Sequence, residues 1–125
     1  MKIVWLKKVF SVCQVCDFSK VDFGQEFCFA AKTDEEYSLV CPADRVPANT
    51  VACDCGWRAF CIQGTLDFSL VGILAAIAAI LAERHIPIFA ISTYNTDYVL
   101  TKEENVAKAT QALRAAGYEV FEQEI

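Results

Sequence analysis

The sequence predicts an α+β fold that combines a β-sheet with two helices, and three observations lead to it. An apolar run without polar residues, at positions 70–82, has the length of a buried helix. Segments with the character of strands flank this run, at 57–64 and 86–91. A pattern of two strands joined by a polar turn occurs twice, at 29–46 and at 89–106.

The first elements of the second half follow in order from these patterns. Residues 57–64 predict a strand, and a helix over about 69–84 follows it. Asp67 or Ser69 can cap the exposed N–H groups at the start of this helix. Residues 86–91 then predict a short apolar strand, which Pro87 begins.

The remaining elements complete a known order. After the polar turn, residues 98–100 predict a strand, and Thr101-x-x-Glu104 predicts a capping box at the start of a second helix. Gly117 ends that helix, and residues 118–121 form the last strand. The apolar face of the helix consists of Val106, Ala109, Leu113 and Ala116. The order β-α-β-β-α-β is that of a ferredoxin-like split βαβ unit.

The first half of the chain repeats part of this pattern. The matched positions are Phe29 and Phe89, Ala30 and Ala90, Thr33 and Thr93, Val46 and Val106, and, with one gap, Tyr37 and Tyr98, Leu39 and Leu100. Only eleven residues separate Val15 from Phe27, so a full crossover helix hardly fits there. The sequence therefore predicts a tandem repeat, with an abbreviated first copy in residues 1–56 and a complete copy in residues 57–125.

Composition and charge restrict the classes of partner. The chain has 125 residues and a formal charge of −5, and its basic residues are scattered. Nucleic-acid binding requires a basic face, so we expect no nucleic-acid partner. The run at 70–82 is too short for a membrane span, and residues 1–12 do not form a secretory signal. These features predict a cytoplasmic protein that does not bind a membrane.

The chain has seven cysteines, which could bind a metal or form disulfides. Cys13-x-x-Cys16 and Cys53-x-Cys55 could offer four thiolates, but the second spacing differs from that of the usual zinc knuckle. Most of the cysteines lie in apolar segments with the character of strands, where a free cysteine acts as a small hydrophobic side chain. We expect no bound metal, no other cofactor and no disulfide.

Two segments resemble a known family. GTLDFSLVGIL (64–74) and FAISTYNTDYVL (89–100) resemble the small tandem ACT-domain proteins of bacteria and the ACT modules of the CASTOR family of arginine sensors. The resemblance is close over 57–120 and loose over 1–56. ACT domains are ferredoxin-like regulatory modules that bind amino acids, often between paired modules. The resemblance thus implies a non-catalytic regulatory protein whose partner is a free amino acid.

The same resemblance implies which residues bind the ligand. These are Gly72, Ile73, Thr93, Tyr94 and Asp97, which match the residues that line the pocket of the sensors. A helix start suits the carboxylate of an amino acid, and Asp97 would pair with its ammonium or with a basic side chain. Gly72 in a helix costs about 1 kcal/mol relative to alanine, which calls for a reason such as a ligand close to the backbone.

Alternative interpretations remain open at this point. Gly72 can be a packing glycine, and Asp97 can simply bond to backbone N–H groups of its turn. A structural ACT module for dimerisation or partner docking is the second hypothesis, because the shortened first copy lacks one wall of a paired site. An enzyme ranks last, since no catalytic motif is present. Open sheet edges predict a homo-oligomer, a dimer or larger, in either case.

Overall fold

The computed structural model describes residues 1–63 and 72–123. The chain forms two compact units, which are considered one at a time. Unit 1 contains Met1–Lys7 and Arg58–Ile125, and unit 2 contains Lys8–Trp57. Each helix and strand belongs to one of these units or contributes residues to both.

Two long strands contribute to both units. They are β1 (Lys2–Val15) and β4 (Thr50–Ile62). The sequence suggested a division between residues 56 and 57, whereas the chain divides one residue later and groups Met1–Lys7 with the second half. The start of β1 belongs there because it lies in the sheet of unit 1.

The sheet of unit 1 has the strand order β7-β1-β4-β6-β5. β5 (Phe89–Ser92) and β6 (Asp97–Lys102) form an antiparallel hairpin. β7 (Glu119–Glu122) runs parallel to the start of β1, with Lys2 opposite Glu119. The strands expected in the second half are therefore present, but the first residues of the chain lie between the last strand and β4.

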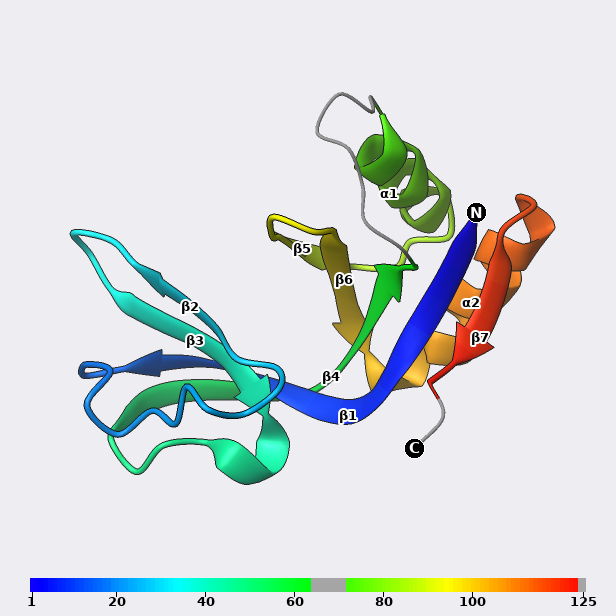
Figure 1. Cartoon of the computed structure of the whole chain (residues 1–125). Helices are drawn as coiled ribbons and strands as arrows, with labels where there is room; N and C mark the ends of the chain where they lie inside the picture. The colour runs from blue at the N-terminus through cyan, green and yellow to red at the C-terminus, as the bar shows by residue number, and fades with distance from the viewer. Residues whose placement is uncertain (64–71, 124–125) are drawn as a thin grey trace. The chain divides into compact units, whose positions relative to one another are not determined.

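Two helices complete unit 1, as expected from the sequence. They are α1 (Ile73–Glu83) and α2 (Val106–Ala115), and Figure 1 shows both beside the strands of this unit. The expected start of the first helix, with its candidate caps Asp67 and Ser69, lies outside the described residues. The shared core of helices and strands contains Ile3, Trp5, Phe60, Ile62, Ile77, Leu81, Ile86, Val99, Ala109, Leu113 and Val120.

Both helices end in the same way. Gly117 follows α2 with a φ of 98°, and the Tyr118 N–H reaches back to the Leu113 carbonyl at 3.1 Å. His85 takes the equivalent place after α1 with a φ of 56°, and the Ile86 N–H bonds to the Leu81 carbonyl at 3.1 Å. These are Schellman motifs, so Gly117 ends its helix as predicted. His85 ends α1 through its backbone conformation.

The predicted capping box is wrong. Thr101 is fully buried in β6, and its hydroxyl donates to the Pro87 carbonyl at 2.9 Å instead of capping a helix. A 3-10 turn, Glu103–Asn105, precedes α2, and no side-chain hydrogen bond caps either element. Tertiary packing of β6 thus overrides the local T-x-x-E pattern.

Unit 2 has the strand order β2-β3-β1-β4. β2 (Phe29–Lys32) and β3 (Tyr37–Pro42) form a hairpin, and a 3-10 turn, Ala43–Arg45, follows it. No α-helix is present among the residues of this unit, as Figure 1 shows, and residues 16–28 pack on the sheet instead. The small core contains Cys13, Val15, Leu39 and Cys41.

The two hairpins match more closely than the sequence alignment suggested. β2 and β5 start at residues 29 and 89, β3 and β6 at 37 and 97, and the 3-10 turns at 43 and 103. Phe29 pairs with Val40 and Phe89 pairs with Leu100, so the equivalent positions need no gap. The gap introduced between Tyr37 and Tyr98 was therefore wrong, since Tyr37 is equivalent to Asp97.

Candidate functional site

The polar turn between β5 and β6 is a tight hairpin turn. The Thr93 N–H donates to the Thr96 carbonyl at 2.9 Å, which encloses only Tyr94 and Asn95. The Thr93 hydroxyl donates to the same carbonyl at 2.8 Å and accepts the Thr96 N–H at 3.3 Å. The Thr93 side chain therefore stabilises the turn itself, while Tyr94 projects outward and is 80% exposed.

Asp97 lies at the first position of β6 and is half-buried. It pairs across the hairpin with Ser92, whose hydroxyl donates to Asp97 Oδ1 at 2.5 Å. The N–H groups of Thr93 and Thr96 bond within the turn, to the Thr96 carbonyl and to the Thr93 hydroxyl. The Asp97 carboxylate has a fixed orientation at the end of the hairpin.

Thr96 is a site residue that the sequence analysis missed. Its side chain is 8% exposed, and its hydroxyl donates to the Ile62 carbonyl of β4 at 3.2 Å. This bond holds the turn beside the end of β4, where the chain leaves the sheet towards α1. A threonine in a turn gives no local sign of such a long-range partner. Only the folded structure, in which the turn lies beside β4, reveals it.

The start of α1 contains the other two predicted site residues. Gly72 is the N-cap residue, with a φ of 81° and ψ of 3°, and its carbonyl accepts the Ala76 N–H at 2.8 Å. The positive φ explains the glycine, because other residues rarely adopt this conformation. Crowding does not explain it, since a Cβ there would meet no described atom within 4 Å. Ile73 packs its side chain against the core of unit 1. The first turn of α1 holds no acidic residue.

The predicted residues thus form two groups within unit 1. Thr93, Tyr94 and Asp97 share the end of one hairpin, and Gly72 and Ile73 share a helix start. Ligand contacts of these five residues remain a prediction. The bond from Thr96 to Ile62 is the described link between the hairpin end and the strand that leads towards the helix.

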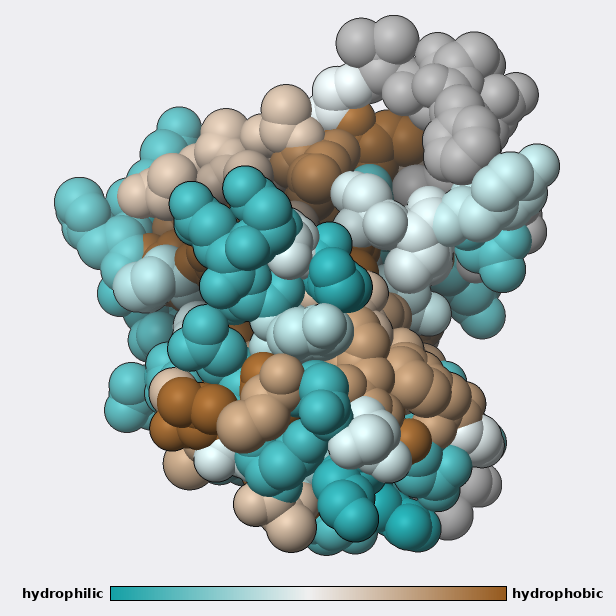
Figure 2. Space-filling view, turned by 90° about the vertical axis from the view of Figure 1, so that its left-hand side faces the viewer, coloured by the Kyte–Doolittle hydropathy of each residue, from teal (hydrophilic) through white to brown (hydrophobic). Residues whose placement is uncertain are grey.

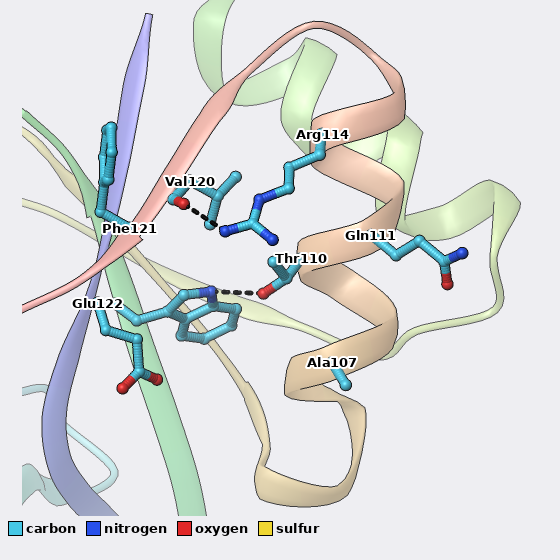
Figure 3. Close-up of a pocket in the computed structure, with 8 residues that line it drawn as sticks. Ala107, Thr110, Gln111, Arg114, Val120, Phe121 and Glu122 are labelled. Atoms are coloured by element: carbon cyan, nitrogen blue, oxygen red, sulfur yellow. Dashed lines mark hydrogen bonds between the residues drawn. The ribbon is translucent and has the colours of Figure 1, made fainter.

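A separate groove of about 400 Å³ lies between α2 and β7 (Figure 3). The Trp5 indole N–H donates to the Thr110 hydroxyl at 2.9 Å, and Arg114 donates to the Val120 carbonyl at 2.7 Å. Glu122 accepts a charged hydrogen bond from Arg58 at 3.4 Å. The bonds of Trp5 to Thr110 and of Arg114 to Val120 hold α2 to the sheet. We therefore interpret the groove as part of the packing of α2 on the sheet and not as a ligand site.

In residues 1–63 and 72–123, no three or more His, Cys, Asp or Glu side chains gather as metal ligands would. Within the same residues, neither helix has the length and apolar character that crossing a bilayer requires.

The comparison with protein families identifies the class of the chain. The profile described as "ACT domain" matches residues 52–115, which is about half of the chain. That segment includes most of β4, both helices and the β5–β6 hairpin. The chain therefore belongs to the ACT-domain family. No curated protein matches it in sequence.

Solved structures show the same fold over the whole chain. A protein of Agobacterium tumefaciens is 27% identical, with a TM-score of 0.87 over 99% of this chain and 94% of that one. The aspartate kinase of Clostridium acetobutylicum is 17% identical, with a TM-score of 0.66 over 91% of this chain and 34% of the kinase.

A third structure corresponds to a regulatory domain. It is a putative C-terminal regulatory domain of aspartate kinase from Porphyromonas gingivalis, 22% identical, with a TM-score of 0.58 over 90% of this chain and 94% of that domain. These similarities agree on a mixed α/β ACT fold of the ferredoxin-like type. They support the family resemblance seen in the sequence at this level, and not the particular likeness to the CASTOR arginine sensors.

Proposed function

We propose that this protein is a non-catalytic regulatory protein that binds a free amino acid through its ACT domain. The observation that carries the proposal is the ACT-domain match over residues 52–115, which includes the candidate turn and the helix start. The likeness to a regulatory domain of aspartate kinase supports a regulatory role in place of catalysis. The proposed location of this activity is the cytoplasm.

The carboxylate of Asp97 supports a cationic group of the ligand as its partner. Within the described residues it receives one hydrogen bond, from Ser92 to Oδ1. The turn is already stabilised by Thr93 and Thr96, so stability of the turn does not require a charged residue here. An ammonium group would form a charge-assisted hydrogen bond with the remaining oxygen.

The start of α1 supports an anionic group as the second contact. A helix N-terminus carries unpaired N–H groups and a positive dipole end. No described acidic side chain in the first turn of α1 compensates this charge, and no described side chain caps Gly72. A ligand carboxylate is therefore the proposed partner of the Gly72–Ile73 backbone.

The equal spacing of the two hairpins supports a tandem arrangement as the origin of the fold. In this proposal unit 2 is the abbreviated ACT-like copy and unit 1 the complete one. Thr33 closes its turn as Thr93 does, because its N–H donates to the Glu36 carbonyl at 2.9 Å. Tyr37 replaces Asp97 in that copy, so the proposal assigns ligand binding to the hairpin of unit 1.

The alternative is a structural ACT module that forms dimers or docks a partner without a ligand. Several large apolar side chains are exposed, namely Met1, Phe23, Val51, Tyr94 and Phe121. On the face seen in Figure 2, hydrophobic surface alternates with hydrophilic surface. Outer strands such as β5 also offer backbone groups for pairing with a second copy, so a homo-oligomer is proposed under both functions.

The Asp97→Asn variant tests the proposed ligand contact. Asparagine keeps the shape and an acceptor for Ser92 but removes the charge. We expect amino-acid affinity, measured by titration calorimetry, to fall by about 1.5–3 kcal/mol, the contribution of a hydrogen bond to a charged group. The melting temperature should change little. The ligand for the titration comes from a thermal-shift screen of the twenty amino acids.

Asp34→Asn is the matched control, because Asp34 is an exposed residue in the equivalent turn of unit 2. It removes the same charge and should leave affinity unchanged. Equal affinity of Asp97→Asn and the parent protein would refute the Asp97 contact. Absence of binding for all amino acids at millimolar concentration would favour the structural alternative, with oligomeric mass by light scattering as its own test.

A further inference from the structure

Two cysteine thiols lie against each other in unit 2. The Cys13 thiol donates a weak hydrogen bond to the Cys53 sulfur at 3.5 Å. Cys13 lies on β1 and Cys53 on the neighbouring strand β4. The sulfurs would need to approach by only about 1.5 Å to reach a bond length of about 2.05 Å.

The surroundings of the pair differ for the two sulfurs. Cys13 is 3% exposed in the core of unit 2, whereas Cys53 is exposed. An open hollow of about 300 Å³ reaches both residues, and Glu36 and Asp54 line it together with Gln14 and Ser38. A small reagent can therefore meet Cys53 from solvent with Cys13 directly behind it, while the two carboxylates disfavour an anionic reagent.

We propose that Cys13 and Cys53 form a reversible disulfide when the protein meets a neutral hydroperoxide, with Cys53 as the sulfur attacked first and Cys13 as the resolving thiol. This is independent of amino-acid binding, because both residues belong to unit 2 and the proposed ligand contacts belong to unit 1.

The reaction has two steps that balance. The Cys53 thiolate attacks the hydroperoxide, so that an S–O bond forms, the O–O bond breaks, and the leaving oxygen takes a proton to give water or an alcohol. The Cys13 sulfur then attacks the Cys53 sulfenic acid. The S–S bond forms, the S–O bond breaks, and the departing hydroxide takes the Cys13 proton to give water. A dithiol reverses the reaction by exchange at the exposed Cys53 sulfur.

The second step has a pH signature. Burial, reinforced by the neighbouring Cys53 and Cys41 thiols, raises the pKa of Cys13 to about 12. At neutral pH, Cys13 is therefore protonated nearly always, and its thiolate fraction rises roughly tenfold per pH unit. Disulfide formation from the sulfenic acid should accelerate accordingly as the pH rises from 7 to 9.

The test uses the full reduced chain, hydrogen peroxide and peptide mapping. After oxidation and blocking of free thiols, trypsin should yield residues 9–20 joined to residues 46–58, with a mass about 2 Da below the sum of the two peptides that each carry one blocked cysteine. Each peptide holds a second cysteine, Cys16 or Cys55, so fragment ions must place the bond at Cys13 and Cys53. Dithiothreitol should restore the separate peptides.

Variants and a second oxidant complete the experiment. Cys53→Ser should lose the linked peptide, and Cys16→Ser, which removes another exposed thiol, should keep it. Glutathione disulfide, an anionic oxidant, should modify Cys53 at least tenfold more slowly than peroxide does. A bond at Cys16 or Cys55, oxidation of Cys53 to sulfinic acid without a disulfide, or faster reaction with glutathione disulfide would overturn the proposal.

Discussion

His85 occupies a backbone conformation that side chains rarely adopt. Its φ of 56° lies in the left-handed region, which costs an L-residue about 1–2 kcal/mol. Glycine has no such cost but loses more entropy on folding. We expect His85→Gly to raise the free energy of unfolding by about 0.5–1 kcal/mol, measured by urea denaturation. A clear loss of stability would show that the imidazole makes a contact that outweighs the strain.

Gly117 provides the matched control at the other helix end. It has a φ of 98°, and a Cβ placed there would meet no described atom within 4 Å. Gly117→Ala should therefore destabilise the protein by about 1 kcal/mol through backbone strain alone. If both substitutions shift stability in the same direction, the shared explanation of the two helix ends fails.

Threonine shows how far single residues can be interpreted from sequence. Thr93 was predicted to bind ligand, which remains a prediction, and its hydroxyl holds its own turn. Thr101 was predicted to cap a helix, and its hydroxyl bonds to Pro87. Thr96 attracted no prediction and bonds to Ile62 on another strand. A hydroxyl group suits local and distant partners equally, so the fold decides between them.

At the scale of elements, α2 is held to the sheet by a buried polar contact. Trp5 is 1% exposed, and its indole N–H has the Thr110 hydroxyl as its acceptor. Thr110→Val keeps the shape but leaves that donor unsatisfied. We expect a loss of about 1–3 kcal/mol in the free energy of unfolding, followed by tryptophan fluorescence.

The neighbouring residue Gln111 is an exposed position on the same helix and serves as the control. Gln111→Ala should change stability by no more than about 0.5 kcal/mol. Equal effects of the two substitutions would mean that helix propensity, and not the Trp5 hydrogen bond, determines the result.

Element types were predicted well from periodicity, while strand ends were not. In β1, Trp5 and Leu6 are both buried and Lys7 and Lys8 both exposed, so alternation does not mark this part of the strand. Alternation is lost there because β1 passes from one unit to the other. The start of β4 was missed for a related reason, since residues 51–55 are all exposed and have no buried side to reveal.

Whole-molecule stability should decrease at alkaline pH. Burial raises the pKa of Cys41 from 9.0 to about 11 and that of Cys13 to about 12. Above pH 9 the unfolded chain releases these protons while the folded protein keeps them, so the unfolded state gains stability. The contribution is complete below pH 9 and disappears as the pH rises towards 11–12. Melting temperatures at pH 7.5, 9 and 10.5 should fall in that order.

Removing one buried thiol should weaken that dependence. Cys41→Ala lowers stability at every pH, but the decrease between pH 9 and 10.5 should be smaller than in the parent protein. The exposed Cys16→Ala variant should follow the parent curve. A Cys41→Ala curve parallel to that of the parent would contradict the assignment.

The composition of unit 1 predicts the behaviour of a fragment. Residues 57–125 lack the start of β1, which lies between β7 and β4. We expect this fragment to show no cooperative unfolding by circular dichroism, because β7 and β4 both lose their pairing with β1. Joining residues 1–7 to Arg58 through an Asn-Gly turn should restore it, since β1 and β4 are neighbouring strands and the Gln63 N–H donates to the Lys2 carbonyl at 2.9 Å. Cooperative folding of residues 57–125 alone would contradict this.

The pairing of Lys2 with Glu119 also determines an order of events during protein synthesis. The ribosome makes the start of β1 before the parallel strand beside it, which appears only when residues 119–122 have been added. Every strand of unit 2 exists once residue 57 has been made, so that unit can fold early. Ile3 and Trp5, which are fully buried in the folded protein, stay exposed until β7 has been made. The start of β1 is thus a natural segment for chaperones to protect.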